Sequence, residues 1–119
     1  MDTEQLLNKL TYVFPELWEC AVNQSGDLAS LLGESICEYI SPLITKCFVE
    51  KDQKVTIING KYKGLYHQWV ILHSREGDII VDGSRKQFDM NFDRLEIIRP
   101  NDPDYENYLP THIWYTNNK

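Results

Sequence analysis

The sequence predicts an α+β fold in which N-terminal helices pack on a small antiparallel sheet. In the first third of the chain, apolar residues recur at the three-to-four-residue spacing of an amphipathic helix. Beyond Thr45 the pattern changes to short runs rich in β-branched and aromatic residues, separated by turn residues. Because helical and strand segments are segregated along the chain rather than alternating, an antiparallel sheet is favoured over a parallel one.

The N-terminal helix is expected from Asp2 to about Phe14. Asp2 and Gln5 have the spacing of a capping box, in which each side chain accepts a hydrogen bond from the other residue's backbone N–H. Pro15 follows. Because proline lacks a backbone N–H and disfavours a helical conformation in the residue before it, we expect the helix to end or kink there.

A second helix is expected from about Cys20 to Leu32, because its alanine and leucine residues can form one buried face. Gly33 follows, and glycine commonly terminates a helix because it adopts the left-handed conformation without strain. The segment from Glu34 to Ile40 is expected to form another short helix, which Ser41-Pro42 closes.

The second half of the chain carries the strand signals. Asn59-Gly60 is a turn dipeptide, and residues 75–78 have the composition of a hairpin loop. Residues 100–103 contain two prolines that should end the last strand, and the pattern does not specify where the aromatic tail packs. Strands are expected at Lys54–Asn59, His67–His73, Ile79–Asp82 and Leu95–Arg99.

Length and composition indicate one globular domain spanning residues 1–119. Hydrophobic residues make up 42% and charged residues 25% of the chain, which argues against intrinsic disorder. A chain of 119 residues buries enough surface for a core without metal or disulfide cross-links. The pattern gives no indication of the oligomeric state.

The charge balance restricts the possible partners. Twelve basic residues against eighteen acidic residues give a formal net charge of -6. Such a surface repels nucleic-acid phosphates and anionic lipids, so neither nucleic acid nor a membrane is an expected partner. The first ten residues lack the features of a signal peptide, and no run is long enough to span a bilayer. We expect a cytoplasmic protein; delivery to a host cell by a non-classical secretion route stays open.

The three cysteines are Cys20, Cys37 and Cys47, an odd number at spacings that match no zinc-binding pattern. Free thiols in a reducing compartment are the simplest interpretation. Cys37 and Cys47 are interpreted as core thiols, since free cysteines are usually buried. We expect neither a metal ion nor an organic cofactor.

Cys20 is the candidate nucleophile because the second helix is expected to begin there. The unpaired N–H groups and the positive dipole end of a helix start favour a thiolate over a thiol. The same N–H groups can stabilise the oxyanion that forms during acyl transfer.

His67 begins one expected strand and Asp82 ends the strand that pairs with it, so the two side chains are expected side by side. A carboxylate there would hold the imidazole in one tautomer, and the other ring nitrogen would deprotonate a thiol. A core histidine and a turn aspartate, in Asp82-Gly83, are the structural alternative. The chain order Cys, His, Asp favours a Cys20–His67–Asp82 triad.

Two further histidines are not assigned to this site. His73 shares a strand face with His67 but is expected at the far, hairpin end of the strand. His112 lies in the aromatic tail and is not given a functional role.

The segment His67-Gln68-Trp69-Val70, followed by Asp82-Gly83-Ser84, resembles the H-A-W-V…D-P-T pattern of the transglutaminase-like branch of the papain-like fold. The chain from about Cys20 to Tyr105 is more similar still to small bacterial papain-like proteins of poorly defined function. Their C-x4-S-x2-L-A and D-x-[ST]-x2-Q-F patterns are matched here by Cys20, Ser25, Leu28 and Ala29, and by Asp82, Ser84, Gln87 and Phe88.

The resemblance implies a papain- or transglutaminase-like core and a cysteine-dependent acyl transfer from an amide of a protein or peptide. Cys20 would attack the carbonyl, His67 would move the proton and Asp82 would orient His67. Transfer to water gives a peptidase or deamidase, and transfer to an amine gives a transglutaminase-type enzyme. The glutamine usual six residues before the nucleophile is absent. The candidates for substrate contact are Trp18, Asn23, Gln24 and Gln68.

Two functions of other classes stay open. A catalytically inactive papain-like scaffold, for example a microbial effector or a phage-encoded inhibitor, would bind a protein through its cleft or sheet edge. An interaction protein without this scaffold is the third possibility. Thiol reactivity separates them, because an activated Cys20 would alkylate with iodoacetamide below about pH 8, ahead of Cys37 and Cys47.

Overall fold

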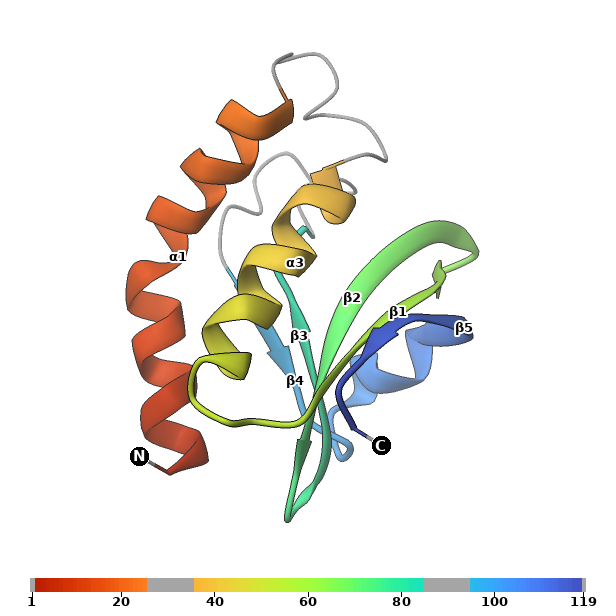
Figure 1. Cartoon of the computed structure of the whole chain (residues 1–119). Helices are drawn as coiled ribbons and strands as arrows, with labels where there is room; N and C mark the ends of the chain where they lie inside the picture. Colours follow the sequence, from red (N-terminus) through yellow and green to blue (C-terminus); the bar gives the residue numbers. More distant parts are fainter. Residues whose placement is uncertain (1, 26–35, 85–94, 119) are drawn as a thin grey trace.

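A computed structural model of the chain describes residues 2–25, 36–84 and 95–118 (Figure 1). Within these residues two helices accompany a five-stranded antiparallel sheet, which confirms the predicted α+β class. A short 3-10 helix, η2 (Pro103–Asn107), precedes the last strand. The helices are α1 (Thr3–Ser25) and α3 (Ile36–Val49), and the strands are β1 (Val55–Tyr62), β2 (Leu65–Ser74), β3 (Gly77–Asp82), β4 (Glu96–Ile98) and β5 (Tyr108–Thr116).

The strands lie in the order β4-β3-β2-β1-β5, and every neighbouring pair is antiparallel. Strands β1, β2 and β3 follow one another as two hairpins. The tail that the sequence left unplaced forms β5, which returns beside β1 and closes that edge of the sheet (Figure 1). Both ends of the chain thereby contribute to one folded unit, with α1 and α3 on one side of the sheet (Figure 1).

The first hairpin turns at Lys63-Gly64, where both residues have positive φ (49° and 84°), as a two-residue hairpin turn requires. The turn predicted at Asn59-Gly60 is wrong, because β1 continues through both residues. Gly60 serves close packing instead. A Cβ atom there would lie 2.6 Å from the Trp69 ring and would also collide with the backbone oxygen of Leu109.

Helix α1 does not end at Pro15, as expected, but continues to Ser25. The predicted capping box is present: the backbone N–H of Gln5 donates to Asp2 Oδ1 (2.8 Å), and that of Asp2 donates to Gln5 Oε1 (3.1 Å). Pro15 is exposed, while Phe14 and Ala21 are buried on either side of it. Packing of this continuous apolar face outweighs the one backbone hydrogen bond that proline removes.

Helix α3 likewise passes through Pro42, so the prediction that Ser41-Pro42 closes a short helix is wrong. Its fully buried residues Ile36, Ile40, Ile44 and Phe48 recur at helical spacing on both sides of the proline and pack on the sheet. Tertiary packing therefore decides where this helix ends, not the local propensity of proline.

The helix predicted from Cys20 to Leu32 is not separate from the first, because Cys20 and the residues up to Ser25 belong to α1. The remainder of that prediction, including Gly33 as its C-cap, lies outside the described residues. Cys20 is consequently in the last turns of a long helix rather than at a helix start.

The sheet carries apolar side chains on both faces. The face covered by α1 and α3 includes Val70 and Leu72 of β2, together with Ile79 and Val81 of β3. The opposite face holds a second, smaller cluster consisting of Ile58, Tyr62, Trp69, Ile80, Ile98 and Tyr108. The second cluster surrounds the polar groups of the candidate site.

Candidate functional site

His67 of β2 and Asp82 of β3 are in direct contact. The distance from His67 Nε2 to Asp82 Oδ2 is 2.7 Å, and both side chains are fully buried. By strand parity they share the sheet face of Trp69 and Ile80, opposite the two helices. The hairpin register thus produces the His–Asp contact that the sequence predicts.

Three further donors fix the Asp82 carboxylate. Tyr108 of β5 donates its hydroxyl to Oδ2 (2.7 Å), the same oxygen that contacts His67. The backbone N–H and the hydroxyl of Ser84 donate to Oδ1 (2.9 and 3.2 Å). Burial raises the pKa of the Asp82 carboxyl, but the contact with His67 and these hydrogen bonds outweigh it, and the pKa lies below its usual value. Asp82 is therefore ionised at neutral pH.

The contact with Asp82 determines the chemistry of the His67 ring. A carboxylate accepts hydrogen bonds, so Nε2 carries a proton, and Nδ1 is the basic atom of the neutral ring. The rings of Trp69, Tyr62 and Tyr108 surround the imidazole at centroid distances of 6.0 to 6.3 Å. The ring is therefore held in one orientation, as a general base requires.

The structure brings Cys37, rather than Cys20, to this region. Cys37 is the second residue of α3, and the backbone N–H of Gln68, the neighbour of His67, hydrogen-bonds its sulfur. The β2–β3 ladder ends at the Val70–Val81 pair, so the described residues provide no strand partner for β2 at Gln68 on that side. The start of α3 lies near the end of β3 (Figure 1).

Gly83 explains how the helix comes so close to the end of β3. A Cβ atom at Gly83 would lie 2.8 Å from Ile44 and 3.0 Å from both Ile40 and Phe14, so a larger residue would displace the helices. The dipeptide Asp82-Gly83 was interpreted as a possible turn; its glycine instead lets α3 approach Asp82.

Cys37 is fully buried, and burial raises the pKa of its thiol to about 12. The negative charges of Glu38 and Asp82 act in the same direction, whereas the Gln68 N–H opposes them. At neutral pH the group is therefore a thiol rather than a thiolate. A nucleophilic role would require a base to remove the proton as the thiol reacts.

Cys20, the nucleophile predicted from the sequence, is exposed on α1. It makes no hydrogen bond with His67 or Asp82 within the described parts of the chain. The physical argument for its activation also fails, because α1 begins at Thr3 and its free N–H groups lie there. The structure thus brings two of the three predicted triad residues together.

The predicted substrate-contacting residues are scattered. Asn23 and Gln24 are exposed in the last turns of α1, and the Trp18 ring packs 6.2 Å from the Phe14 ring at the edge of the core. Gln68 is buried beneath the helices and donates through Nε2 to Asn59 Oδ1 (2.8 Å). The backbone N–H of Gln68 also contacts Cys37.

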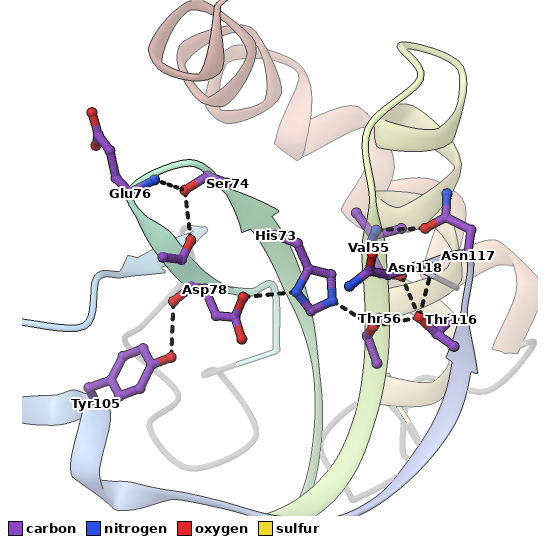
Figure 2. A network of polar contacts seen from close by, with 11 residues as sticks. Val55, Thr56, His73, Ser74, Glu76, Asp78, Tyr105, Thr116, Asn117 and Asn118 are labelled. Carbon is purple, nitrogen blue, oxygen red and sulfur yellow. Dashed lines mark hydrogen bonds and ion pairs between the residues drawn. The ribbon is translucent and has the colours of Figure 1, made fainter.

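His73 forms a second histidine–aspartate contact at the far end of β2 and β3 (Figure 2). Its Nδ1 lies 2.8 Å from Asp78 Oδ1, and its Nε2 lies 2.7 Å from the hydroxyl of Thr56. Thr56 in turn contacts Thr116 Oγ1 (2.7 Å), so the network ties β5 to the hairpin. This hairpin-end position agrees with the sequence-based expectation for His73.

Sequence reasoning missed Cys37 and Tyr108 as members of this cluster. Cys37 is buried, as expected of a core thiol, but its expected core position gave no indication that it lies beside Gln68 and the candidate site. Tyr108 carried no usable signal, because the strand β5 that delivers it to Asp82 was not predicted.

Within residues 2–25, 36–84 and 95–118, no group of three or more His, Cys, Asp or Glu side chains is placed to hold a metal ion. Neither described helix combines the length and the apolar character that crossing a bilayer requires.

Comparison with known proteins adds no family: no family model, no curated protein and no solved structure matches this chain. The function must therefore be argued from the geometry of the site.

Proposed function

We propose that the protein is a cysteine-dependent acyl-transfer enzyme with a papain- or transglutaminase-like core, in which Cys37 is the nucleophile, His67 the general base and Asp82 the residue that orients it. The observation that carries the proposal is the buried contact between His67 Nε2 and Asp82. The residue that follows His67 on β2, Gln68, hydrogen-bonds the Cys37 sulfur through its backbone N–H. The order Cys, His, Asp of the resembling family is retained with Cys37 in place of Cys20.

The proposed reaction begins when the Cys37 thiol gives its proton to His67 Nδ1 and its sulfur attacks the carbonyl carbon of an amide or ester. His67 then returns the proton to the departing amine or alcohol, which leaves a thioester on Cys37. Water or a second amine gives a proton to His67 and attacks the thioester; the C–S bond breaks, the acyl group leaves as an acid or a new amide, and His67 returns the proton to the Cys37 sulfur. Asp82 stabilises the imidazolium that forms in each half of the reaction.

The start of α3 supports this assignment on electrostatic grounds. Cys37 lies in the first turn of the helix, where the unpaired N–H groups and the dipole favour negative charge. The elevated pKa of the resting thiol makes the base essential, since without proton transfer to His67 the buried sulfur stays neutral. A protein or peptide amide is the proposed substrate, and neither a metal ion nor an organic cofactor takes part.

The test uses p-nitrophenyl acetate, a small activated ester, and compares Cys37→Ser with Cys20→Ser. Wild type should release a burst of p-nitrophenolate and carry an acetyl group on Cys37, identified by peptide mass mapping. Cys37→Ser and His67→Ala should each reduce the rate by about 100-fold or more, whereas Cys20→Ser should retain it. Melting temperatures measured on the same samples control for folding.

Loss of the burst in Cys20→Ser, with Cys37→Ser unaffected, would restore the assignment made from the sequence. Acetylation of both cysteines at rates that do not depend on His67 would remove the enzyme proposal altogether.

A catalytically inactive protein-binding module is the second candidate, and one specific observation favours it. Strand β5 is an edge strand with no charged residue, and it exposes Leu109, Ile113, Trp114 and Tyr115. Edge strands normally carry charges that prevent pairing with another strand, so an extended segment of a partner protein would fit there. Absence of any acyl-enzyme, together with binding that Ile113→Lys abolishes, would support this candidate.

A further inference from the structure

Gln68 contains a buried acceptor that no described group satisfies. Its side chain is 1% exposed, and its Oε1 has no hydrogen-bond partner within the described residues, although its Nε2 donates to Asn59 Oδ1 at 2.8 Å. Buried polar atoms nearly always have a partner, so this exception requires a physical cause. The cause lies in the hydrogen bonds that continue from Asn59 toward the surface.

The hydrogen bonds that link Thr111, His112, Asn59 and Gln68 form a series, and the direction of each one follows from Thr111. Its hydroxyl donates to the backbone oxygen of Asn59 (2.9 Å), which uses its one proton. His112 Nδ1, 3.1 Å from the same hydroxyl oxygen, must therefore donate to it. In the neutral ring Nε2 is then an acceptor, and Asn59 Nδ2 donates to it at 3.1 Å. Asn59 consequently presents Oδ1 to Gln68.

Protonation of His112 reverses this order. The imidazolium carries a proton on both ring nitrogens, so Nε2–H would face the Asn59 amino group, donor against donor. Rotation of the Asn59 amide by a half turn restores the contact by turning Oδ1 toward His112. The Asn59 amino group then faces Gln68, whose amide must also rotate to accept from it. The buried Oε1 position of Gln68 becomes an amino group.

The groups around Asn59 permit both orientations of its side-chain amide. The Tyr66 hydroxyl of β2 lies 3.5 Å from Asn59 Oδ1 and donates to Glu38 Oε1 (3.1 Å), so its oxygen can accept from a reversed Asn59. Glu38 on α3 and Tyr66 on β2 are joined to Asn59 by hydrogen bonds, and Lys61 lies two residues from Asn59 on the same face of β1. Glu38 and Lys61 are both exposed, so solvent screens their charges.

We propose that His112, Asn59 and Gln68 form a pH-responsive hydrogen-bond relay: protonation of the exposed His112 reverses both amides and converts the buried Gln68 acceptor into a donor. Histidine is suited to this role because it gains its proton between about pH 5 and 8. The relay begins at the surface on β5 and ends on the residue whose backbone holds the Cys37 sulfur.

The regulatory consequence rests on the proposed function. The Gln68 amide belongs to the residue whose backbone N–H hydrogen-bonds the Cys37 sulfur, so an amino group at its buried end would favour negative charge at the sulfur more than an oxygen does. The relay would therefore make Cys37 easier to ionise on the acidic side of the His112 titration, opposite to the effect of pH on an isolated thiol.

The test is an NMR titration of the full chain from pH 8 to 5, which follows the His112 ring and the side-chain amide signals of Asn59 and Gln68. We expect both amides to shift with the midpoint of His112. His112→Gln, which retains an acceptor without a titrating group, should abolish both shifts. His73→Gln is the matched control, because His73 belongs to the other network, and it should leave both shifts intact.

Gln68 signals that do not follow His112, or shifts that persist in His112→Gln, would overturn the relay. In the same samples, iodoacetamide labelling of Cys37 below the His112 midpoint should be slower in His112→Gln than in wild type, because the variant keeps the Gln68 oxygen in the buried position. Equal labelling with intact amide shifts would retain the relay but refute its effect on Cys37. Unreactive Cys37 in both proteins, again with intact shifts, would refute that effect together with the proposed function.

Discussion

The same two strands carry two histidine–aspartate contacts that differ in almost everything except composition. His67–Asp82 and His73–Asp78 both join β2 to β3 on the same sheet face, with nitrogen–oxygen distances of 2.7 and 2.8 Å. The first pair is fully buried, whereas the His73 and Asp78 side chains are 22% and 52% exposed. The difference shows that the residue pair alone does not define a chemical site.

Register accounts for part of the difference. His73 and Asp78 are direct partners in the β2–β3 ladder, so their contact follows from ordinary cross-strand pairing. Asp82 lies one step beyond the last ladder pair, opposite Trp69, and His67 reaches it diagonally. Because the ladder has ended there, the backbone beside His67 can receive the start of α3. At the hairpin end, in contrast, β2 and β3 remain paired up to Ser74 and Gly77.

The two pairs also differ in which ring nitrogen of the histidine contacts the aspartate. His73 uses Nδ1 for Asp78, and its Nε2 contacts Thr56, whose hydroxyl is already part of a chain to Thr116 (Figure 2). His67 uses Nε2 for Asp82, which makes Nδ1 the basic atom, on the strand that holds a thiol. The exposed pair connects strands, and the buried pair has the arrangement of a general base.

The largest expected difference concerns stability. Asp82→Ala should lower the free energy of unfolding by about 3–5 kcal/mol, because it leaves His67, Tyr108 and Ser84 buried without their common acceptor. Asp78→Ala should lower it by less than about 1 kcal/mol, since exposed ion pairs contribute little. Urea unfolding of both variants at pH 7 measures the comparison.

Equal losses in the two variants would mean that burial does not distinguish the pairs. Asp82→Asn provides a check that is independent of charge, because its amide oxygen can still accept from Tyr108 and its loss should be smaller than that of Asp82→Ala.

The sequence predicted that helices precede an antiparallel sheet, because the apolar spacing is strong and local, but it predicted neither the continuity of α1 nor strand β5. It failed at Pro15, Pro42 and Asn59-Gly60, where a local signal for a break was outweighed by packing. At the two prolines, buried residues continue the apolar face on both sides. Gly60 is required by the Trp69 ring and the backbone of Leu109, which belong to strands distant in sequence.

The candidate site, like the fold, was predictable only where it depends on local pattern. The contact between His67 and Asp82 follows from hairpin register, which can be counted along the chain. The choice between Cys20 and Cys37 cannot be made that way, because it depends on where a helix starts relative to the end of β3. That boundary results from burial of Ile36, Ile40 and Ile44 against the sheet, a tertiary effect.

Each histidine–aspartate pair has a tyrosine that donates to its aspartate residue, which allows a second comparison of the two pairs. Tyr108 donates to Asp82 Oδ2 in the core, and Tyr105 donates to the backbone oxygen of Asp78 near the surface (2.9 Å). Tyr108→Phe should cost about 1–3 kcal/mol, the value of a buried hydrogen bond to a charged group. Tyr105→Phe should cost at most about 0.5 kcal/mol. Thermal melts of both variants measure this; a larger loss in Tyr105→Phe would contradict the ranking.

The smallest expected effect is a slope of stability against pH. The pKa of Asp82 is lowered in the folded protein, chiefly by His67 acting against the effect of burial. An unfolded aspartate has a pKa of about 3.9, so the stability that Asp82 contributes is fully present above that pH. It declines as the pH falls through the folded pKa, by at most about 1.4 kcal/mol per pH unit for one proton. In a carbon NMR titration, the Asp82 carboxyl should remain ionised at pH 3.9. Urea unfolding between pH 5 and 2.5 should show this decline of stability in Asp78→Asn, which leaves Asp82 and its partners unchanged. The decline should be weaker in Tyr108→Phe, which lacks one of the donors to Asp82. An Asp82 carboxyl that titrates at or above pH 3.9 would show that the contact with His67 does not offset burial, and the distinction between the two pairs would then rest on packing alone.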